Sequence, residues 1–461
     1  MTNKNHNRQE TMTGRELALD MLLEILEKGE FCHIIKRQAL SKYQYLPKKE
    51  RALAARLTDG VTERLLSVDY AINQVSRTKT AAMKPVIRNI LRIGAYQILY
   101  MDKIPDSAAC NEAVKLAVKR RFTGLKGFVN GVLRSLVREK EQIRFPNSSI
   151  RLSMPEWILS MWAADYGIHV AEEIAAAFLK ERPTCVRLNS GASPEETITS
   201  LENQGVEVTR LDGFDDILYL AGYDHLEELE AFQKGQIQVQ DLSSTMVCRA
   251  APPQAGSFVL DVCGAPGGKS IHMADLLSGT GMVESRDLTW QKVSMIEENI
   301  GRTGFSNIRA KEWDARRLDE EMREQADIVL ADLPCSGLGI IGRKPDIKYR
   351  ATRESLKDLA NLQREILSVV WKYVKPGGRL VYSTCTINRQ ENQDNAEWFL
   401  ENFPFEPEDI SDRFSGIFCE PSLKQGMLQL LPDRHPCDGF FLAVFRRKVS
   451  ITESSIDDGK M

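Results

Sequence analysis

Apolar residues in the first third of the chain recur at the spacing of an α-helix. Leu17, Met21 and Ile25 share one stripe, and Thr13 with Glu16, just before it, has the pattern of a capping box. The same periodicity returns in residues 53–66, 86–100, 111–119 and 128–137. The pattern predicts an all-helical domain with no obvious catalytic group.

Helical and strand-like patterns mix after a break near residue 146. Helical segments are expected at 156–166, 169–180 and 193–204, a strand at 184–189, and a β-rich run at 206–220. The mixture predicts a small α+β domain, and no motif in it indicates chemistry.

From about residue 236, short apolar runs alternate with amphipathic helical patterns. Strands are expected at 258–262, 282–285, 308–312, 328–331 and 379–383, with a long helix at 353–374. Two further runs, 427–431 and 439–445, are close enough to pair as an antiparallel edge. This alternation is typical of an α/β domain with a doubly wound, Rossmann-like sheet.

The chain of 461 residues is long enough for about three domains. We place an all-helical domain at residues 1–145, the small α+β domain at 150–235 and the α/β domain at 236–449. A polar tail at 450–461 completes the predicted organisation.

Composition narrows the class of protein. Hydrophobic residues make up 43% and charged residues 27%, which excludes collagen-like and disordered chains. The nine cysteines include no C-x-x-C pair, so neither a disulfide framework nor a metal site is expected. Neither a signal peptide nor a membrane-spanning run is recognisable, so we expect a cytoplasmic monomer that has no membrane partner.

Charge is distributed unevenly along the chain. Residues 1–150 hold 27 Lys and Arg against 15 Asp and Glu, whereas the remaining residues hold 34 against 49. A basic amino-terminal module favours a polyanionic partner such as RNA, and the alternative is an ordinary solvated surface.

A glycine-rich segment follows the first predicted strand of the α/β domain. It reads DVCGAPGGKS and contains Cys263, Gly264, Ala265, Pro266, Gly267, Gly268 and Lys269. Ligands of open α/β sheets bind at the carboxyl ends of the strands, where small residues let the backbone approach them. Cys263 stands where a Walker A motif needs glycine, and residues 328–332 resemble a Walker B strand, so a nucleotide hydrolase is one alternative.

Two acids at the following strand ends favour a different ligand. Asp287 lies about twenty residues after the glycine segment, where an acid commonly binds ribose hydroxyls. Asp314 follows the third predicted strand and is well placed to meet an adenine amino group. Each acid alone also suits a helix N-cap or a solvated loop, but together they fit a nucleoside such as S-adenosylmethionine.

Two cysteines follow the next two strands. Cys335 stands in the sequence Asp332-Leu333-Pro334-Cys335, and Cys385 ends the fifth predicted strand. We expect both thiols to face one cleft, because adjacent parallel strands end at the same edge of a sheet. Four other cysteines are expected to be buried hydrophobic residues, and they are Cys32, Cys110, Cys185 and Cys248.

This pair suits methylation of a pyrimidine carbon. Carbon 5 of cytosine becomes nucleophilic only after a thiolate has added to carbon 6. A second thiol assists removal of the carbon 5 proton and release of the product. A carboxylate such as Asp332 is suited to hold the base edge and stabilise the adduct.

These motifs resemble those of the RNA cytosine-5 methyltransferases that use two cysteines. The segments that carry the resemblance are DVCGAPGGKS, ADLPCSGLGIIGRKPDIKY, YSTCTINRQEN and LLPDRHPCDGFFLAVF. Segments of the helical region, AYQILYMDKIPDSAACNEAVKLAVKR and GFVNGVLRSL, are similar to the NusB-type RNA-binding fold. The combination resembles the RsmB/Sun family over nearly the whole chain.

The resemblance implies a function and roles for individual residues. The family methylates a cytosine of 16S rRNA, at position 967 in the usual numbering, with S-adenosylmethionine as cofactor. Cys385 matches the nucleophile and Cys335 the cysteine that aids release. Cofactor-binding matches are Cys263 to Lys269, Asp287 for ribose, Asp314 for adenine, and Asp332 between cofactor and cytosine.

The sequence departs from the family pattern at two places. The glycine segment reads Cys-Gly-Ala-Pro, with Gly264 where the family usually has alanine, and Glu284-Ser285-Arg286 is an unusual approach to Asp287. Both departures bear on the fit of the cofactor. A non-catalytic RNA-binding assembly or antitermination factor and a tRNA cytosine-5 methyltransferase are the alternatives within RNA biology. Two interpretations of Arg343 and Lys344 are equally compatible with the sequence: they bind RNA phosphates, or they are ordinary residues of an exposed loop.

Overall fold

The computed structural model describes residues 12–449 and divides the chain into two compact units. One unit contains the chain up to Lys180 together with Ile341–Arg350, and the other contains Glu181–Ile340 and the chain from Ala351 onward. The polar tail expected at 450–461 lies outside the described residues. None of the helices in the described residues is both long and apolar enough to span a membrane.

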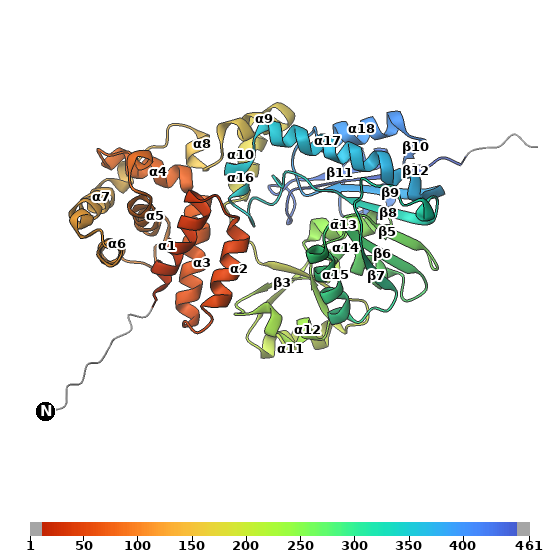
Figure 1. The fold of residues 1–461 in the computed structure, drawn as a ribbon, viewed down its shortest axis with the longest axis horizontal. Coiled ribbons are helices and arrows are strands. Elements are labelled where there is room, and N and C mark those ends of the chain that lie inside the picture. The colour runs from red at the N-terminus through yellow and green to blue at the C-terminus, as the bar shows by residue number, and fades with distance from the viewer. Residues whose placement is uncertain (1–11, 450–461) are drawn as a thin grey trace, which may run out of the picture. The chain divides into compact units, whose positions relative to one another are not determined.

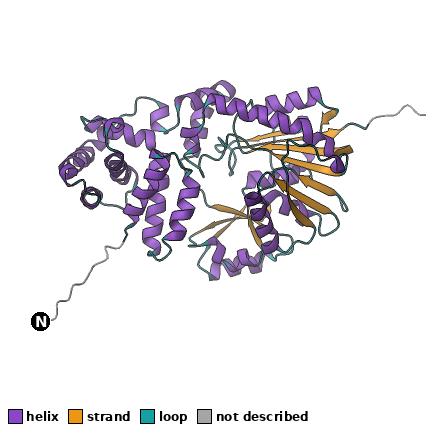
Figure 2. Ribbon diagram, in the orientation of Figure 1, coloured by secondary structure: helices purple, strands orange, loops and turns teal. Residues whose placement is uncertain are grey.

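The first unit is helical throughout its described residues (Figures 1 and 2). Its helices are α1 (Gly14–Leu22), α2 (Cys32–Lys42), α3 (Lys48–Glu63), α4 (Leu65–Val75), α5 (Pro85–Tyr100), α6 (Asp106–Lys119), α7 (Lys126–Glu139), α8 (Ser148–Arg151), α9 (Glu156–Tyr166), α10 (Ile168–Ala177) and α16 (Ile347–Arg350). The predicted capping box is present, since the Thr13 hydroxyl accepts from the Glu16 amide and the Glu16 carboxylate accepts from the Thr13 amide. Helix α5 is buried along most of its length and packs against α3, α4, α6 and α7.

A short segment from the second half of the chain completes this unit. Residues 341–350, which include α16, pack among the amino-terminal helices. Lys348 is almost wholly buried there, and its Nζ donates to the Glu63 carbonyl at 2.8 Å. The Asp346 carboxylate accepts from the Cys32 amide at 3.2 Å. The helical unit is therefore built from two separate stretches of sequence.

The second unit begins with a small antiparallel sheet in the order β2-β3-β1-β4. Its elements are β1 (Thr184–Leu188), α11 (Pro194–Asn203), β2 (Glu207–Leu211), β3 (Phe214–Ala221), α12 (Glu230–Gln233) and β4 (Ile237–Val239). The sequence pattern places helices α9 and α10 in this small domain, but in the structure they belong to the helical unit. The domain bounds at residues 145 and 235 stay a prediction.

The main sheet has eight strands, in the order β10-β12-β9-β8-β5-β6-β7 with β11 paired to β12. The strands are β5 (Phe258–Asp261), β6 (Met282–Asp287), β7 (Ile308–Glu312), β8 (Ala326–Asp332), β9 (Val374–Thr384), β10 (Phe405–Pro407), β11 (Met427–Leu430) and β12 (Phe440–Arg447). All five predicted parallel strands are present, which confirms the doubly wound α/β fold.

The carboxyl-terminal strands differ from the prediction in one respect. β11 and β12 are antiparallel partners as expected, but β12 also pairs with β9 and with β10. β12 is therefore an interior strand, which explains why its first six residues are buried. The three-residue strand β10 was not predicted, because so short a segment has no periodicity.

Helices cover both faces of this sheet (Figure 1). α13 (Leu242–Ala250), α14 (Gly268–Leu276) and α15 (Trp290–Thr303) cover one face, and α17 (Arg353–Val370) and α18 (Gln393–Asn402) cover the other. Neighbouring residues of one strand face opposite layers, as Val259 and Leu260 of β5 do. The strand order reverses between β5 and β8, which is where ligands of doubly wound sheets bind.

Candidate active site

The loop after β5, residues 262–268, lies at this reversal point. The amide of Gly264 donates to the Arg286 carbonyl at 2.8 Å, and the amide of Gly267 donates to the Gly264 carbonyl at 2.6 Å. Gly267 has a φ of 106°, a left-handed conformation that favours glycine, and α14 begins at the next residue. The glycine loop is thus held mainly by its own backbone and by the end of β6.

The two departures from the family pattern are physically connected. A Cβ on Gly264 would lie 2.1 Å from Ser285 Oγ and 3.0 Å from Ser270 Oγ. Ser285 therefore occupies the space that an alanine at position 264 needs. Ser285 Oγ and Ser270 Oγ are 2.8 Å apart, and Ser270 donates to Asp261 Oδ2 at 2.6 Å. Burial raises the pKa of Asp261 to about 7.

A hollow of about 200 Å³ opens beside the glycine loop. Its lining includes Asp261, Asp332, most of the loop, and the start of α13 with Gln240 and Asp241. The Nε2 atom of Gln240 is buried and has no hydrogen-bond partner among the described residues. A Cβ on Gly268 would meet open space, so the loop presents bare backbone to the hollow. These features suit a ligand with polar groups, and the residues present fit a nucleoside cofactor.

The two predicted nucleoside-binding acids occupy different settings. Asp287, at the end of β6, is buried and accepts from the Ala265 amide at 3.1 Å, which ties it to the glycine loop. Its other oxygen accepts from the Leu288 amide and from Lys292 Nζ at 2.9 Å. Asp314 lies two residues past β7 and is paired with Arg316, whose hydrogen bond holds the pKa of Asp314 low. Neither acid lines the hollow itself.

Lys269 does not have the role of the lysine in a phosphate-binding loop, because its ammonium group is paired with a carboxylate. Its Nζ lies 2.7 Å from Asp332 Oδ2, and Ser383 Oγ donates to Asp332 Oδ1 at 2.7 Å. Burial opposes the charge on Lys269, but the Asp332 carboxylate more than offsets this, and the pKa of Lys269 is raised. Asp332 is thereby fixed in orientation at the end of β8, next to the hollow.

The two cysteines meet as the strand order predicts. Cys335 Sγ and Cys385 Sγ are 3.3 Å apart. The hydrogen bond to Cys385 and burial both raise the pKa of Cys335, which favours its protonated form. The four cysteines expected to be structural are buried, which confirms that expectation.

A buried carboxylate lies behind the two cysteines, and the sequence reasoning did not single it out. Glu391 is fully buried and accepts hydrogen bonds from Ser336, Gln363 and Asn388. Gln240 and Asp241 are further residues that line the hollow without having been predicted. The QEN segment that contains Glu391 contributed to the resemblance, but nothing in a single sequence distinguishes it from an ordinary loop.

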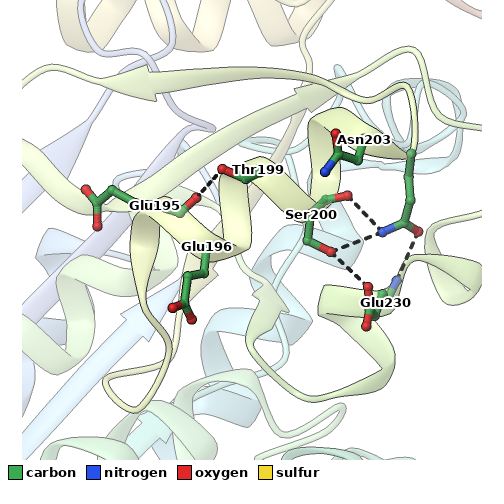
Figure 3. Close-up of a pocket in the computed structure, with 7 residues that line it drawn as sticks. Glu195, Glu196, Thr199, Ser200, Asn203 and Glu230 are labelled. Carbon is green, nitrogen blue, oxygen red and sulfur yellow. Dashed lines mark hydrogen bonds between the residues drawn. The ribbon is translucent and has the colours of Figure 1, made fainter.

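Other predicted or concave features lie elsewhere. Arg343 is exposed and Lys344 half-buried, and both belong to the stretch that completes the helical unit. A hollow of about 480 Å³ on α11 is lined by Glu195, Glu196 and Glu230 with neutral side chains between them (Figure 3). Its Ser200 and Glu230 are hydrogen-bonded to each other. This carboxylate-rich surface is unsuited to an anionic partner.

Comparison with known proteins assigns all three regions. Residues 249–446 match the model of 16S rRNA methyltransferase RsmB/F, residues 12–138 the NusB family, and residues 154–225 the ferredoxin-like domain of RsmF/B-like methyltransferases. A probable ribosomal RNA small subunit methyltransferase B of Bacillus subtilis is 36% identical over 94% of this chain and 98% of its own length. The corresponding Klebsiella pneumoniae protein is 31% identical over 93% of this chain and 97% of its own length.

Solved structures agree with the fold. The crystal structure of PH0851 covers 95% of this chain and 99% of its own length with a TM-score of 0.78 and 25% identity. A methyltransferase homolog protein from Pyrococcus horikoshii covers 65% of this chain and 97% of its own length with a TM-score of 0.55 and 28% identity.

These matches set aside the nucleotide hydrolase, and the pairing of Lys269 with Asp332 is consistent with that outcome. Members of the matched family use S-adenosylmethionine. The chain has an all-helical NusB-like region, a ferredoxin-like domain and a methyltransferase domain, and it belongs to the 16S rRNA methyltransferase RsmB/F family.

Proposed function

We propose that this chain methylates carbon 5 of a cytosine in 16S rRNA, cytosine 967 in the usual numbering, through a covalent bond between Cys385 and carbon 6. The observation that carries the proposal is the pair of sulfurs 3.3 Å apart, at the ends of adjacent strands. Asp332 is the last residue of β8, the strand that Cys335 follows, and it lines the hollow beside the glycine loop. The cytoplasm is the proposed compartment and a monomer the proposed state.

The first step is addition of the Cys385 thiolate to carbon 6. Cys385 Sγ lies 3.3 Å from Cys335 Sγ, and Cys385 passes its thiol proton to solvent before it attacks. The new carbon–sulfur bond takes the electron pair of the thiolate, N3 takes up a proton from solvent, and the ring becomes an enamine with a nucleophilic carbon 5.

Asp332 and Lys269 hold the base during this change. Asp332 keeps a fixed orientation because Lys269 and Ser383 bind its two oxygens, and both oxygens retain lone pairs for a donor on the base. The ammonium group of Lys269 adds positive charge next to a ring that gains electron density on addition. Fixed charges of this kind stabilise the adduct more than the free base.

The residues that would hold the cofactor are the glycine loop, Asp287 and Asp314. When bound, S-adenosylmethionine supplies the sulfonium methyl group that carbon 5 accepts, and S-adenosylhomocysteine leaves. The unpaired Gln240 Nε2 is available to bind a polar group in the hollow, whereas the amides of Gly264, Ala265 and Gly267 already donate within the protein. Asp287 also anchors the loop through the Ala265 amide.

Release of the product uses the second sulfur. After methyl transfer, Cys335 passes its thiol proton to solvent and becomes the base of the release step. The resulting thiolate removes the carbon 5 proton. N3 then loses its proton, the bond between carbons 5 and 6 becomes double again, and the carbon–sulfur bond breaks with its electron pair returning to Cys385.

RNA phosphates are proposed to bind the helical unit. A hollow of about 640 Å³ on this unit is lined by Arg15, Lys115, Lys119 and Lys126 together with Glu16 and Glu112. Such binding weakens steeply with salt, because each neutralised phosphate releases counterions. The target base must be unstacked to reach the sulfurs, as in other enzymes that act on a base.

Trapping of the adduct tests the proposal. We expect Cys335→Ala protein, incubated with 16S rRNA and S-adenosylmethionine, to accumulate a covalent complex visible on a denaturing gel, because addition survives and release is slowed. Cys385→Ala should give none, and Cys419→Ala, which changes an exposed cysteine, should behave as the parent protein. Trapping by Cys385→Ala would contradict the assigned roles.

Bisulfite sequencing of total RNA from a deletion strain identifies the substrate. Loss of one 5-methylcytosine in 16S rRNA is the expected result. Loss in a tRNA would replace the proposed substrate, and no loss at all would favour the non-catalytic RNA-binding factor.

A further inference from the structure

Glu391 is a buried charged residue that the mechanism above does not use. It lies six residues after Cys385 and has no exposed surface. Its two carboxylate oxygens accept four hydrogen bonds from three side chains and one backbone amide. Because a buried carboxylate is costly to keep, a site with this many donors indicates a specific task.

The first two donors belong to the loop that carries Cys335, residues 333–340, here named the Pro-Cys loop. The amide of Ser336 donates to Glu391 Oε2 at 2.8 Å, and Ser336 Oγ donates to Oε1 at 2.5 Å. Ser336 is adjacent to Cys335, so these bonds fix the backbone on which the sulfur is mounted. Ser336 Oγ also lies 2.7 Å from Thr386 Oγ1, next to Cys385.

The other two donors tie the same carboxylate to the second cysteine and to the helix layer. Asn388, in the loop that follows Cys385, donates to Oε1 at 2.8 Å. Gln363 of α17 donates to Oε2 at 3.1 Å and also to the Pro334 carbonyl at 2.9 Å. One side chain thus joins both cysteine-bearing loops to a helix that is anchored in the core.

We propose that Glu391 is a positioning residue that holds Cys335 and Cys385 at the separation needed for thiol pairing and for methyl transfer. The catalytic half of this inference rests on the proposed function, whereas the geometric half does not. The carboxylate is needed as well as the size, because all four hydrogen bonds to it come from donors, and both of its oxygens accept. A glutamine at this position would place an NH₂ group, which is a donor, opposite two other donors, so two of the four hydrogen bonds would be lost.

Thiol pairing tests the geometric half without RNA or cofactor. Oxidised glutathione accepts the two electrons of the thiol pair by exchange, giving a Cys335–Cys385 disulfide and two molecules of reduced glutathione. We expect Glu391→Gln to form this disulfide about tenfold more slowly than the parent protein, because small displacements are costly in oriented reactions. Mass spectrometry of the cysteine peptides measures the rate.

Glu397→Gln is the matched control, since Glu397 is exposed on the neighbouring helix α18. It should pair its thiols at the parent rate. Ser336→Ala keeps the amide donor and loses only the hydroxyl, so an intermediate rate is expected, and it serves if Glu391→Gln does not fold. Pairing at the parent rate in folded Glu391→Gln and Ser336→Ala would overturn the inference.

Methyl transfer kinetics separate this inference from the proposed function. We expect Glu391→Gln to lower kcat about tenfold or more and to leave KM for RNA and for S-adenosylmethionine unchanged, because the sulfurs are displaced and the binding surfaces are not. Slower thiol pairing with an unchanged kcat would support the positioning role and contradict the two-cysteine mechanism. A rise in both KM values with kcat unchanged would contradict a positioning role in catalysis.

Discussion

The glycine loop and the two cysteine-bearing loops lie at the same edge of one sheet, but they are held in different ways. The glycine loop is fixed by backbone hydrogen bonds and by close packing, as the 2.1 Å approach between a Gly264 Cβ and Ser285 Oγ shows. The cysteine loops are fixed by side-chain hydrogen bonds that converge on the single carboxylate of Glu391. The closely packed glycine loop is therefore sensitive to substitutions that add atoms, whereas the cysteine-bearing loops are sensitive to substitutions that remove a hydrogen-bond acceptor.

Lys269 connects the two regions, and its removal should have the largest effect. Lys269→Met is expected to lower methyl transfer about 100-fold, because Asp332 loses the partner that orients it. The free energy of unfolding should fall by about 2 kcal/mol, since a partly buried carboxylate is left without its cation. Urea denaturation and single-turnover kinetics measure the two effects. Lys292→Met, which changes an exposed lysine paired with Asp287, is the control, and equal losses in both variants would contradict the special role of Lys269.

The glycine loop should be destabilised by any side chain added at Gly264, because the added atoms would clash with Ser285. Gly264→Ala is expected to cost about 2 kcal/mol of stability, because Ser285 must turn its hydroxyl away from Ser270. Ser285→Ala alone should cost about 1 kcal/mol for the lost hydrogen bond. The double variant should then be more stable than the sum of the two single effects predicts, as a double-mutant cycle measures. Strict additivity would show that the two departures from the family pattern are unrelated.

A pH-dependent effect concerns the acid beneath the glycine loop. Burial raises the folded-state pKa of Asp261 from 3.8 to about 7, so the folded protein binds a proton that the unfolded chain has lost. Stability should therefore decline as the pH rises between these two values, and the decline should end above the folded pKa. Asp261→Asn should remove this part of the dependence when unfolding is measured across the range. An unchanged pH slope in Asp261→Asn would contradict the assignment.

Strand ends and their chemistry could be predicted from the sequence because both depend on local pattern. Apolar runs located the five parallel strands, and topology then required that the residues after β8 and β9 meet, as Cys335 and Cys385 do. The capping box of α1 was predictable for the same reason. A single sequence is therefore sufficient to predict which residues meet when they stand at the ends of neighbouring parallel strands.

Contacts between distant side chains were not predictable in this way. Lys269 looks like part of a phosphate-binding loop, and only the structure shows that it pairs with Asp332, 63 residues later. Glu391 and Gln363 meet through the packing of a loop against α17, for which no periodicity gives a sign. Helix α2 was missed because only Cys32 along it is fully buried, and its other apolar residues are only partly covered, so its apolar face is weak. The interior position of β12 depends on which strand pairs with β9, and hydrophobicity alone does not decide this.

The short stretch Ile341–Arg350 has a consequence for how this protein can be divided. It begins six residues after Cys335, leaves the α/β fold, and supplies the helical unit with the buried Lys348 before the chain returns at Ala351. A truncation at residue 180 would deprive the amino-terminal fragment of α16 and would leave the other fragment with buried charged residues, Asp346 and Lys348, that have lost their hydrogen-bond partners. The two activities proposed for these regions, RNA binding and methylation, are therefore encoded in interleaved stretches of sequence. To express the two units separately, the helical fragment would need residues 341–350 attached to it as an additional segment.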